Sequence, residues 1–368
     1  MKISCDREVL IRRLSVVSRA VTPRPNLLVL NGLHVVAEDG TVTITGSDLD
    51  MTIRARVDMD VAEPGTVVLP AKLATDIARA LDTDEVSLSV EGDDAVISGG
   101  RSEFKVKTYA IADYPELAKV EGKGVTLDGD VLATGIRQVA GAASDDSARP
   151  ILTGVLLEEH DGGMRMVATD SYRLAMCDLP AKGVLSAKQR VLVPARALDE
   201  LGRVLEGAGE VTVYLGARDV TFEVADGSGT IQITTRLIEG EFPKYESLIP
   251  DEYPRRLTVD RDALTHATRR VKLMASAAVT PIRLSQRSDG VDLNVIAQDV
   301  GAAEETVDAA YTGDDLVIAF NPDYLLAGLE ATMSESVTLD TLDELKPAVL
   351  RPAGRDDFLY LLMPVRIS

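Results

Sequence analysis

The chain has 368 residues and a formal net charge of −20, because 59 acidic residues outnumber 39 lysines and arginines. This length allows two or three domains, and their cores must be aliphatic, because aromatic residues make up only 4% and tryptophan is absent. The charge predicts a protein that as a whole repels nucleic acid and anionic membranes. No apolar run approaches the roughly 20 residues of a membrane-spanning helix.

Cys5 and Cys177 stand outside any CxxC or Cys/His cluster, which favours two buried free thiols in a reducing cytosol over a disulfide. The N-terminal stretch MKISCDREVLIRRL lacks the apolar core of a signal peptide. We therefore expect a cytoplasmic protein without membrane attachment.

Four elements follow one another in the first part of the chain. Residues 6–21 predict a helix with one apolar stripe that begins after Asp6. Residues 42–57 read as two strands broken at an acidic turn around Asp48. Pro70 opens a second helix, PAKLATDIARAL, because proline suits the first helical turn. A pair of strands then leads into a linker that contains Pro115.

The same four elements return twice in the same order, which indicates an internal repeat. The acidic turns recur 122 residues apart, from Asp48 to Asp170, and 129 residues apart, from Asp170 to Asp299. The other landmarks are helices at 131–143, after Asp128 or Asp130, and at 261–275, after Asp260; helices opened by Pro194 and Pro322; and strand pairs at 86–97 with 103–111, 211–224 with 230–238, and 337–350 with 358–367.

We therefore predict three repeated domains of one α+β fold, at residues 1–120, 121–250 and 251–368. Each domain carries two helices packed on antiparallel sheets rich in Val, Ile and Thr.

A catalytic constellation is missing from the pattern. His34, His160 and His266 fall in unrelated parts of the repeat, and no Gly-rich phosphate loop, GxSxG or HExxH motif is present. We expect no catalytic residue, no metal and no cofactor. The alternative is an enzyme with a pocket between repeats that acts on a nucleotide or a sugar.

Basic residues gather on the predicted helices despite the negative total. Lys72 and Arg79 lie seven residues apart on the second helix, and Arg196 and Arg203 occupy the same places in the second copy, where the third copy has Tyr324. These residues fit ordinary solubilising charge, or a surface that faces phosphates without reading sequence.

The chain ends in the apolar stretch FLYLLMPVRIS, residues 358–368. Part of it fits a last strand, but Pro364 breaks the hydrogen-bond ladder, so Val365, Arg366 and Ile367 need another place to pack.

Over its whole length the chain resembles the bacterial replicative sliding clamp, the DNA polymerase III beta subunit. The resemblance is carried by five stretches in order: TGSDLDM (Thr45–Met51), ATDSYRLA (Ala168–Ala175), EFPKYESLIP (Glu241–Pro250), NPDYLLAGL (Asn321–Leu329) and YLLMPVRI (Tyr360–Ile367).

This resemblance implies a ring-shaped, head-to-tail homodimer with sheets outside and helices lining the hole through which double-stranded DNA passes. It implies a non-catalytic processivity factor for DNA replication, which tethers the replicative polymerase. Its implied partners are the DNA polymerase III alpha subunit, the clamp loader and other clamp-motif proteins. An acidic exterior with basic helices turned inward would account for the charge.

Two sets of site residues follow from the resemblance. The DNA-facing residues are Arg24, Lys72, Arg79, Arg149, Arg196 and Arg203. The partner-peptide cleft comprises Leu152, Thr169, Ser171, Tyr172, Arg173, Leu174, Pro243, Ser247, Leu248, Leu345, Pro347, Leu361, Met363, Pro364, Val365 and Arg366.

The chain departs from the family pattern at two of these places. Pro150 and Ile151 stand where the family often has aromatic residues, which argues against a contact between this loop and single-stranded template. Ser171 and Tyr172 stand where Gly-His is frequent, which predicts a narrower and more polar cleft mouth.

For the dimer interface we expect Phe104 and Val106 of one chain to meet Leu273 and Met274 of the other. The alternative is that these four residues belong to the internal core.

Overall fold

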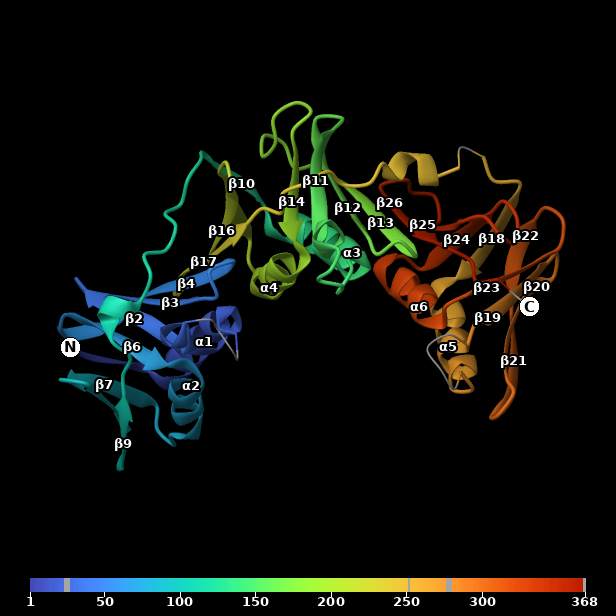
Figure 1. Cartoon of the computed structure of the whole chain (residues 1–368). Helices are drawn as coiled ribbons and strands as arrows, with labels where there is room; N and C mark the ends of the chain where they lie inside the picture. Colours follow the sequence, from blue (N-terminus) through green and yellow to red (C-terminus); the bar gives the residue numbers. More distant parts are fainter. Residues whose placement is uncertain (23–26, 251, 276–279, 367–368) are drawn as a thin grey trace. The chain divides into compact units, whose positions relative to one another are not determined.

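The computed structural model describes residues 1–22, 27–250, 252–275 and 280–366 and divides into two compact units (Figure 1). Unit 1 contains Met1–Ala133 and Arg196–Leu237, and unit 2 contains Thr134–Ala195 and Ile238–Ser368. The units cut across the predicted repeats, because the second half of the middle repeat belongs with the first repeat.

All six predicted helices form. They are α1 (Arg7–Val17), α2 (Ala71–Ala80), α3 (Gly129–Val139), α4 (Ala195–Leu205), α5 (Arg261–Lys272) and α6 (Pro322–Ala331). α1 packs beside α2 in unit 1, and α5 packs beside α6 in unit 2 (Figure 1).

Aspartates cap the first helix of every repeat, as predicted. The Asp6 carboxylate accepts the N–H of Val9 at 3.0 Å, and Asp260 accepts the N–H of Ala263 at 2.7 Å. In the middle repeat Asp128 performs this task, because it accepts the N–H of Val131 at 3.0 Å. Each cap satisfies a backbone donor that has no partner within the helix.

The prolines differ in position from the prediction in two repeats. Pro322 is the first residue of α6, but Pro70 and Pro194 end the preceding strands, and α2 and α4 begin one residue later. The backbone of Pro70 is extended, with ψ of 113°. A proline at the end of a strand also costs no hydrogen bond. The prolines therefore indicated the strand-to-helix boundary, but in these two repeats the helix begins one residue later than predicted.

Unit 1 contains two antiparallel sheets. The first has the strand order β5 (Asp60–Glu63), β1 (Lys2–Asp6), β7 (Glu85–Glu91), β8 (Asp94–Gly99), β9 (Ser102–Lys107). The second has the order β10 (Gly124–Asp128), β15 (Glu210–Leu215), β16 (Asp219–Ala225), β17 (Gly229–Arg236), β4 (Met51–Asp58), β3 (Thr41–Ser47), β2 (Gly32–Glu38), β6 (Gly65–Pro70).

Unit 2 also contains two antiparallel sheets. The larger has the order β14 (Arg190–Pro194), β11 (Gly154–His160), β12 (Gly163–Thr169), β13 (Arg173–Leu179), β26 (Phe358–Leu362), β25 (Ala348–Pro352), β24 (Ser336–Thr341), β18 (Arg255–Asp260), β22 (Ala309–Thr312). The smaller has the order β21 (Gly301–Val307), β20 (Gly290–Ala297), β19 (Ile282–Arg287), β23 (Leu316–Phe320).

The predicted strand pair of each repeat is a three-stranded meander instead. The first member, expected over 86–97, is the hairpin β7–β8, and the matching segments form β15–β16 and β24–β25. Gly92 turns the first hairpin with φ of +60°, a conformation that glycine adopts without a steric penalty. The last strand ends at Leu362, short of the predicted Ile367.

Two sheets continue from one repeat into the next. β4 of the first repeat pairs with β17 of the second over seven residue pairs, and β13 of the second pairs with β26 of the third over five. In both junctions the third strand after a repeat's first helix meets the last strand of the following repeat. The strands equivalent to these two are β21 and β9, which each lie at the edge of a sheet.

Candidate functional site

Two of the expected DNA-facing arginines lie on α4 in unit 1, and both are engaged by carboxylates. Arg196 donates from Nη1 to Asp48 Oδ2 at 2.6 Å and from Nη2 to the carbonyl oxygen of Arg19 at 3.1 Å. Arg203 donates from Nη1 to Glu200 at 2.5 Å, and Arg19 reaches the other oxygen of Glu200 at 3.3 Å. These residues therefore form one mixed-charge cluster, and Arg19 is a member that the expected set lacked.

Lys72 and Arg79 line a cavity of about 810 Å³ in unit 1. Its wall also carries the hydroxyl groups of Ser15, Ser18 and Thr75. Arg79 donates to Ser15 Oγ at 2.9 Å. Within the described residues neither Lys72 nor Arg79 forms an ion pair, so both cations are available to an anion.

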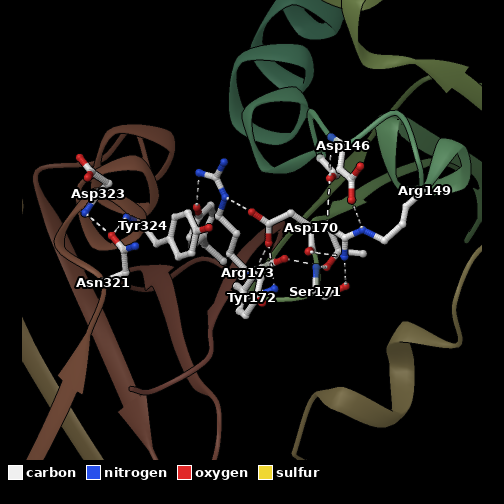
Figure 2. Close-up of polar contacts among 12 residues, drawn as sticks. Asp146, Arg149, Asp170, Ser171, Tyr172, Arg173, Asn321, Asp323 and Tyr324 are labelled. Atoms are coloured by element: carbon white, nitrogen blue, oxygen red, sulfur yellow. Dashed lines mark hydrogen bonds and ion pairs between the residues drawn. The ribbon is translucent and has the colours of Figure 1, made fainter. Parts of the chain in front are cut away.

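Arg149 lies in unit 2, and Arg24 lies outside the described residues. Arg149 forms an ion pair with Asp146 at 2.9 Å and donates to Ser171 Oγ at 3.2 Å (Figure 2). An expected DNA contact is therefore joined to a residue of the expected peptide cleft.

The acidic turn that precedes Tyr172 is built by Asp170. Its Oδ1 accepts the backbone N–H groups of Tyr172 and Arg173 at 2.8 and 3.0 Å, and its Oδ2 pairs with Arg173 Nε at 2.9 Å (Figure 2). Ser171 consequently adopts a φ of +83°. Asp48 binds the backbone N–H groups of Asp50 and Met51 in the same way, so the aspartate is a shared structural feature.

Tyr172 and Arg173 both contact Tyr324, which projects from α6 (Figure 2). The two tyrosine rings stack with centroids 6.3 Å apart, and the guanidinium carbon of Arg173 lies 4.7 Å from the Tyr324 ring centroid. Arg173 also donates to the Tyr360 hydroxyl at 3.3 Å. Burial raises the pKa of Tyr360 to about 12 against the opposing effect of the Arg173 charge, so its hydroxyl stays protonated at neutral pH.

The C-terminal tail finds its place beside this aromatic group. After β26 ends, Met363 donates its backbone N–H to the carbonyl oxygen of Tyr172 at 2.9 Å. Val365 donates to the carbonyl oxygen of Ala319 on β23 at 2.8 Å. Both bonds hold the segment beyond Leu362 within unit 2, while Ile367 lies outside the described residues.

The expected cleft residues all belong to unit 2 and divide into a buried and an exposed set. Leu174 and Leu361 belong to one core cluster with Tyr245 and Val349, and so they can form a floor but offer little surface. The other buried members are Leu152 and Thr169. The exposed members are Ser171, Tyr172, Pro243, Ser247, Leu248, Leu345, Met363 and Arg366, while Arg173, Pro347, Pro364 and Val365 are half-buried.

Tyr324 and Tyr360 are the two members of this group that the expected site lacked. A signal for Tyr324 was present, because it stands where the other repeats carry Lys72 and Arg196. An aromatic ring in place of a cation indicates that this helix position serves a different contact in the third repeat.

The four expected interface residues are distributed over both units. Phe104 on β9 is 38% exposed and Leu273 at the end of α5 is 82% exposed, whereas Val106 is 5% exposed and packs in the core of unit 1. For Val106 the alternative of an internal core residue fits the burial. Met274 is half-buried, and its Cε lies close to Gly301 at the start of β21.

The described residues gather no group of three or more metal-ligating side chains. His34 stacks on Tyr114, His160 contacts Arg165, and His266 lies on α5, so the histidines belong to three separate surroundings. No helix in the described part of the chain is long and apolar enough to cross a membrane.

Three domains of one known protein family match nearly the whole chain. Residues 1–118 match the N-terminal domain of the DNA polymerase III beta subunit, residues 126–244 match its central domain, and residues 246–366 match its C-terminal domain. The exact domain boundaries stay a prediction.

Individual relatives agree with this match. The beta sliding clamp of Streptomyces coelicolor is 36% identical over the full length of both chains, and that of Staphylococcus aureus is 32% identical over all of this chain and 99% of its own. The crystal structure of a Pseudomonas aeruginosa sliding clamp bound to griselimycin is 32% identical, with a TM-score of 0.91, and that of a Bacillus subtilis sliding clamp is 26% identical, with a TM-score of 0.92; each covers both chains completely. No similarity supports the alternative of a nucleotide- or sugar-processing enzyme.

Proposed function

Because this chain belongs to the DNA polymerase III beta subunit family, the beta sliding clamps, we propose that two copies close around duplex DNA and tether the replicative polymerase to it. The observation that carries the proposal is the threefold repeat, in which sheets run on from one repeat into the next. The full-length similarity to sliding clamps supplies the function.

The strand junctions suggest how a second copy binds. Since β4 pairs with β17 and β13 pairs with β26, the equivalent β21 of one chain is expected to pair with β9 of another. Both strands lie at sheet edges, where unpaired backbone groups are available for pairing. Such pairing makes the dimer head to tail, because different edges of the two chains meet.

The side chains around these edges are complementary. Two exposed apolar residues would be covered by a partner. They are Phe104 on β9 and Leu273, which follows α5, the helix that packs against β21. β9 carries Lys105 and Lys107, which share the single carboxylate of Asp94, and β21 carries Glu304 and Glu305, of which Glu305 pairs with Arg270. The lysine side of β9 would therefore face the exposed carboxylate of Glu304. Val106, which is buried, would contribute through the backbone of β9.

For DNA we propose sequence-independent contacts between phosphates and Lys72, Arg79, Arg196 and Arg203, to which Arg149 and Arg24 would add. Support comes from the free cations that line the unit 1 cavity and from the exposed guanidinium groups on α4. The helices α2 and α4 that carry these four cations contain no aromatic residue, which argues against base stacking by these helices.

For partner proteins we propose a peptide site on unit 2, where exposed Tyr172, Leu248, Leu345 and Met363 would contact apolar side chains of a linear motif. The polymerase alpha subunit, the clamp loader and other proteins with such a motif would share this site. The role is non-catalytic, and we place it in the cytoplasm, where chromosomal DNA is replicated in bacteria.

The test is retention on DNA of different topology. The chain is loaded onto nicked circular DNA with a clamp loader, the circle is linearised, and the bound fraction is measured by gel filtration before and after. A clamp stays on the circle and runs off the linear ends, and its mass in solution is that of a dimer. A monomeric protein, or equal retention on both forms, would refute the proposal.

A further inference from the structure

Glu200 on α4 binds two arginines from different parts of unit 1. Its Oε1 accepts from Nη1 of Arg203 at 2.5 Å, and its Oε2 lies 3.3 Å from Nη1 of Arg19. The side chain of Glu200 is 12% exposed, whereas those of Arg19 and Arg203 are 38% and 55% exposed. The acid is therefore covered while both cations reach solvent.

Arg196 extends this group into a cluster of three arginines and two carboxylates. It binds Asp48 and the carbonyl oxygen of Arg19, so the cluster carries a net charge of +1 and not +3. Lys72 and Arg79 form no ion pair among the described residues. Unit 1 thus presents two kinds of cation to an anion, free ones on α2 and neutralised ones around α4.

The two carboxylates of the cluster differ in what else they do. Asp48 also holds the turn between β3 and β4, because its Oδ1 accepts the N–H groups of Asp50 and Met51. In the described part of the chain the Glu200 carboxylate bonds only to arginine side chains. Its contribution is therefore charge and orientation, which a substitution can remove without loss of a backbone hydrogen bond.

We propose that Glu200 weakens the grip of unit 1 on DNA, because it makes phosphates compete for Arg19 and Arg203. The inference rests on the proposed function, since it requires this cluster to face the duplex. Each phosphate that a protein neutralises releases counterions and strengthens binding, so a protein that must slide benefits from fewer such contacts. A phosphate near Arg19 or Arg203 meets a guanidinium that already shares its charge with Glu200.

The experiment uses the full-length Glu200→Gln variant and a labelled short duplex, with fluorescence anisotropy at a series of salt concentrations. Glutamine keeps the shape and one acceptor but removes the charge. Removal of one carboxylate charge raises the net charge of the cluster from +1 to +2, which allows one more phosphate to be neutralised. We therefore expect tighter binding at low salt and a plot of log Kd against log salt that is steeper by about 0.9. Run-off from linearised DNA should also slow.

Glu38→Gln is the matched control, because Glu38 is an exposed residue of β2 in unit 1 and its substitution changes the net charge equally. Equal slopes for the Glu200 and Glu38 variants would overturn the proposal. So would a slope that stays steep when Arg19→Gln and Arg203→Gln are added to Glu200→Gln. A Glu200 variant that melts earlier but binds as the wild type does would show a structural role and also overturn it.

These outcomes are separate from those of the clamp test. Wild-type protein that is not retained on nicked circles refutes the clamp, whatever the salt slopes are. Wild-type retention on circles together with unchanged slopes refutes only the role of Glu200.

Discussion

Arg13 is a fully buried arginine on a helix face that otherwise consists of aliphatic residues. Its guanidinium donates to both carboxylate oxygens of Asp226, at 2.6 and 2.7 Å, and to Ser228 Oγ at 2.6 Å. A charge without water is tolerated only when it is paired and hydrogen-bonded in this way. The contact joins α1 of the first repeat to the turn between β16 and β17 of the second.

The pKa of Asp226 reflects the same contact. Burial acts to raise the pKa of this carboxyl, but hydrogen bonds and charge from Arg13, with help from Ser228, outweigh burial and hold the pKa below its usual value. The depressed pKa in the folded state means that the ion pair stabilises the fold above about pH 4, the usual range of aspartate, and that this stability is lost as the pH falls through the folded-state pKa.

We predict that Asp226→Asn lowers the free energy of unfolding by about 3–5 kcal/mol at neutral pH, because it leaves the Arg13 charge buried without a counter-charge. Urea denaturation followed by circular dichroism measures this. The difference from wild type should shrink as the pH falls below about 4, where Asp226 of the unfolded chain is protonated, and vanish below the lower folded-state pKa of Asp226. Arg12→Ala, at the exposed neighbouring position, should cost no more than about 0.5 kcal/mol. A loss under about 1 kcal/mol at pH 7 would contradict the prediction.

A residue-scale signal for Arg13 exists in the sequence, but its partner does not follow from it. Arg13 lies three residues after Leu10 and four before Val17, on the apolar face that the periodicity identifies. Asp226 stands 213 residues away. No local pattern specifies a contact at that separation, so the buried ion pair needed the fold.

Strands at sheet edges determine what the chain can pair with. β9 and β21 present free edges, and Leu273, which is 82% exposed, follows α5, the helix that packs against β21. A leucine so exposed adds nothing to the stability of its own chain, but it would be covered in the proposed dimer.

We predict that Leu273→Asp converts the dimer into monomers, because it places an unpaired charge in an apolar contact. Light scattering after gel filtration measures the mass. Val317→Asp is the control, because Val317 is 48% exposed on β23, at the other edge of the same sheet. The proposed interface is wrong if both variants stay dimeric, or if the control dissociates as well.

The segment after β26 carries a separate prediction. Deletion of residues 363–368 removes the backbone bonds to Tyr172 and Ala319, together with exposed Met363. Binding of a polymerase-derived peptide should be lost, as isothermal titration calorimetry would show, while the mass stays that of a dimer because β9 and β21 are untouched. Met363→Glu should weaken binding of the peptide, although the tail stays in place. Dissociation of the truncated chain would instead assign the tail to the dimer interface.

At the scale of elements, periodicity and capping predicted the six helices, because a helix is decided by residues close in sequence. The aspartate caps were visible for the same reason. The prediction treated each hairpin, such as β7–β8, as one strand. A two-residue turn such as the one at Gly92 interrupts the apolar pattern too briefly to be noticed in the sequence. Leu174 and Leu361 show what could not be predicted of the candidate site. The family resemblance placed both residues in the peptide cleft, but it did not show that both are buried in the core.

For the whole molecule, the repeat was readable from four landmarks, but the joining of repeats was not. β4 and β17 are separated by about one and a half repeats, and their alternating pattern would suit many partners. The net charge was also insufficient to predict the binding surface, because a total of −20 does not show that free cations lie together on α2. Partner strands and charge distribution both depend on residues distant in sequence.

Because the two edges β9 and β21 differ, they also determine whether the assembly closes into a ring. A contact between different surfaces can repeat without limit, and it ends in a closed ring only if the angles between successive copies add up to a full turn. The direction in which one copy presents its two edges depends in turn on contacts inside the chain, among them the buried Arg13–Asp226 contact and the pairing of β4 with β17. Substitutions that loosen these contacts are therefore expected to yield open filaments as well as a less stable fold.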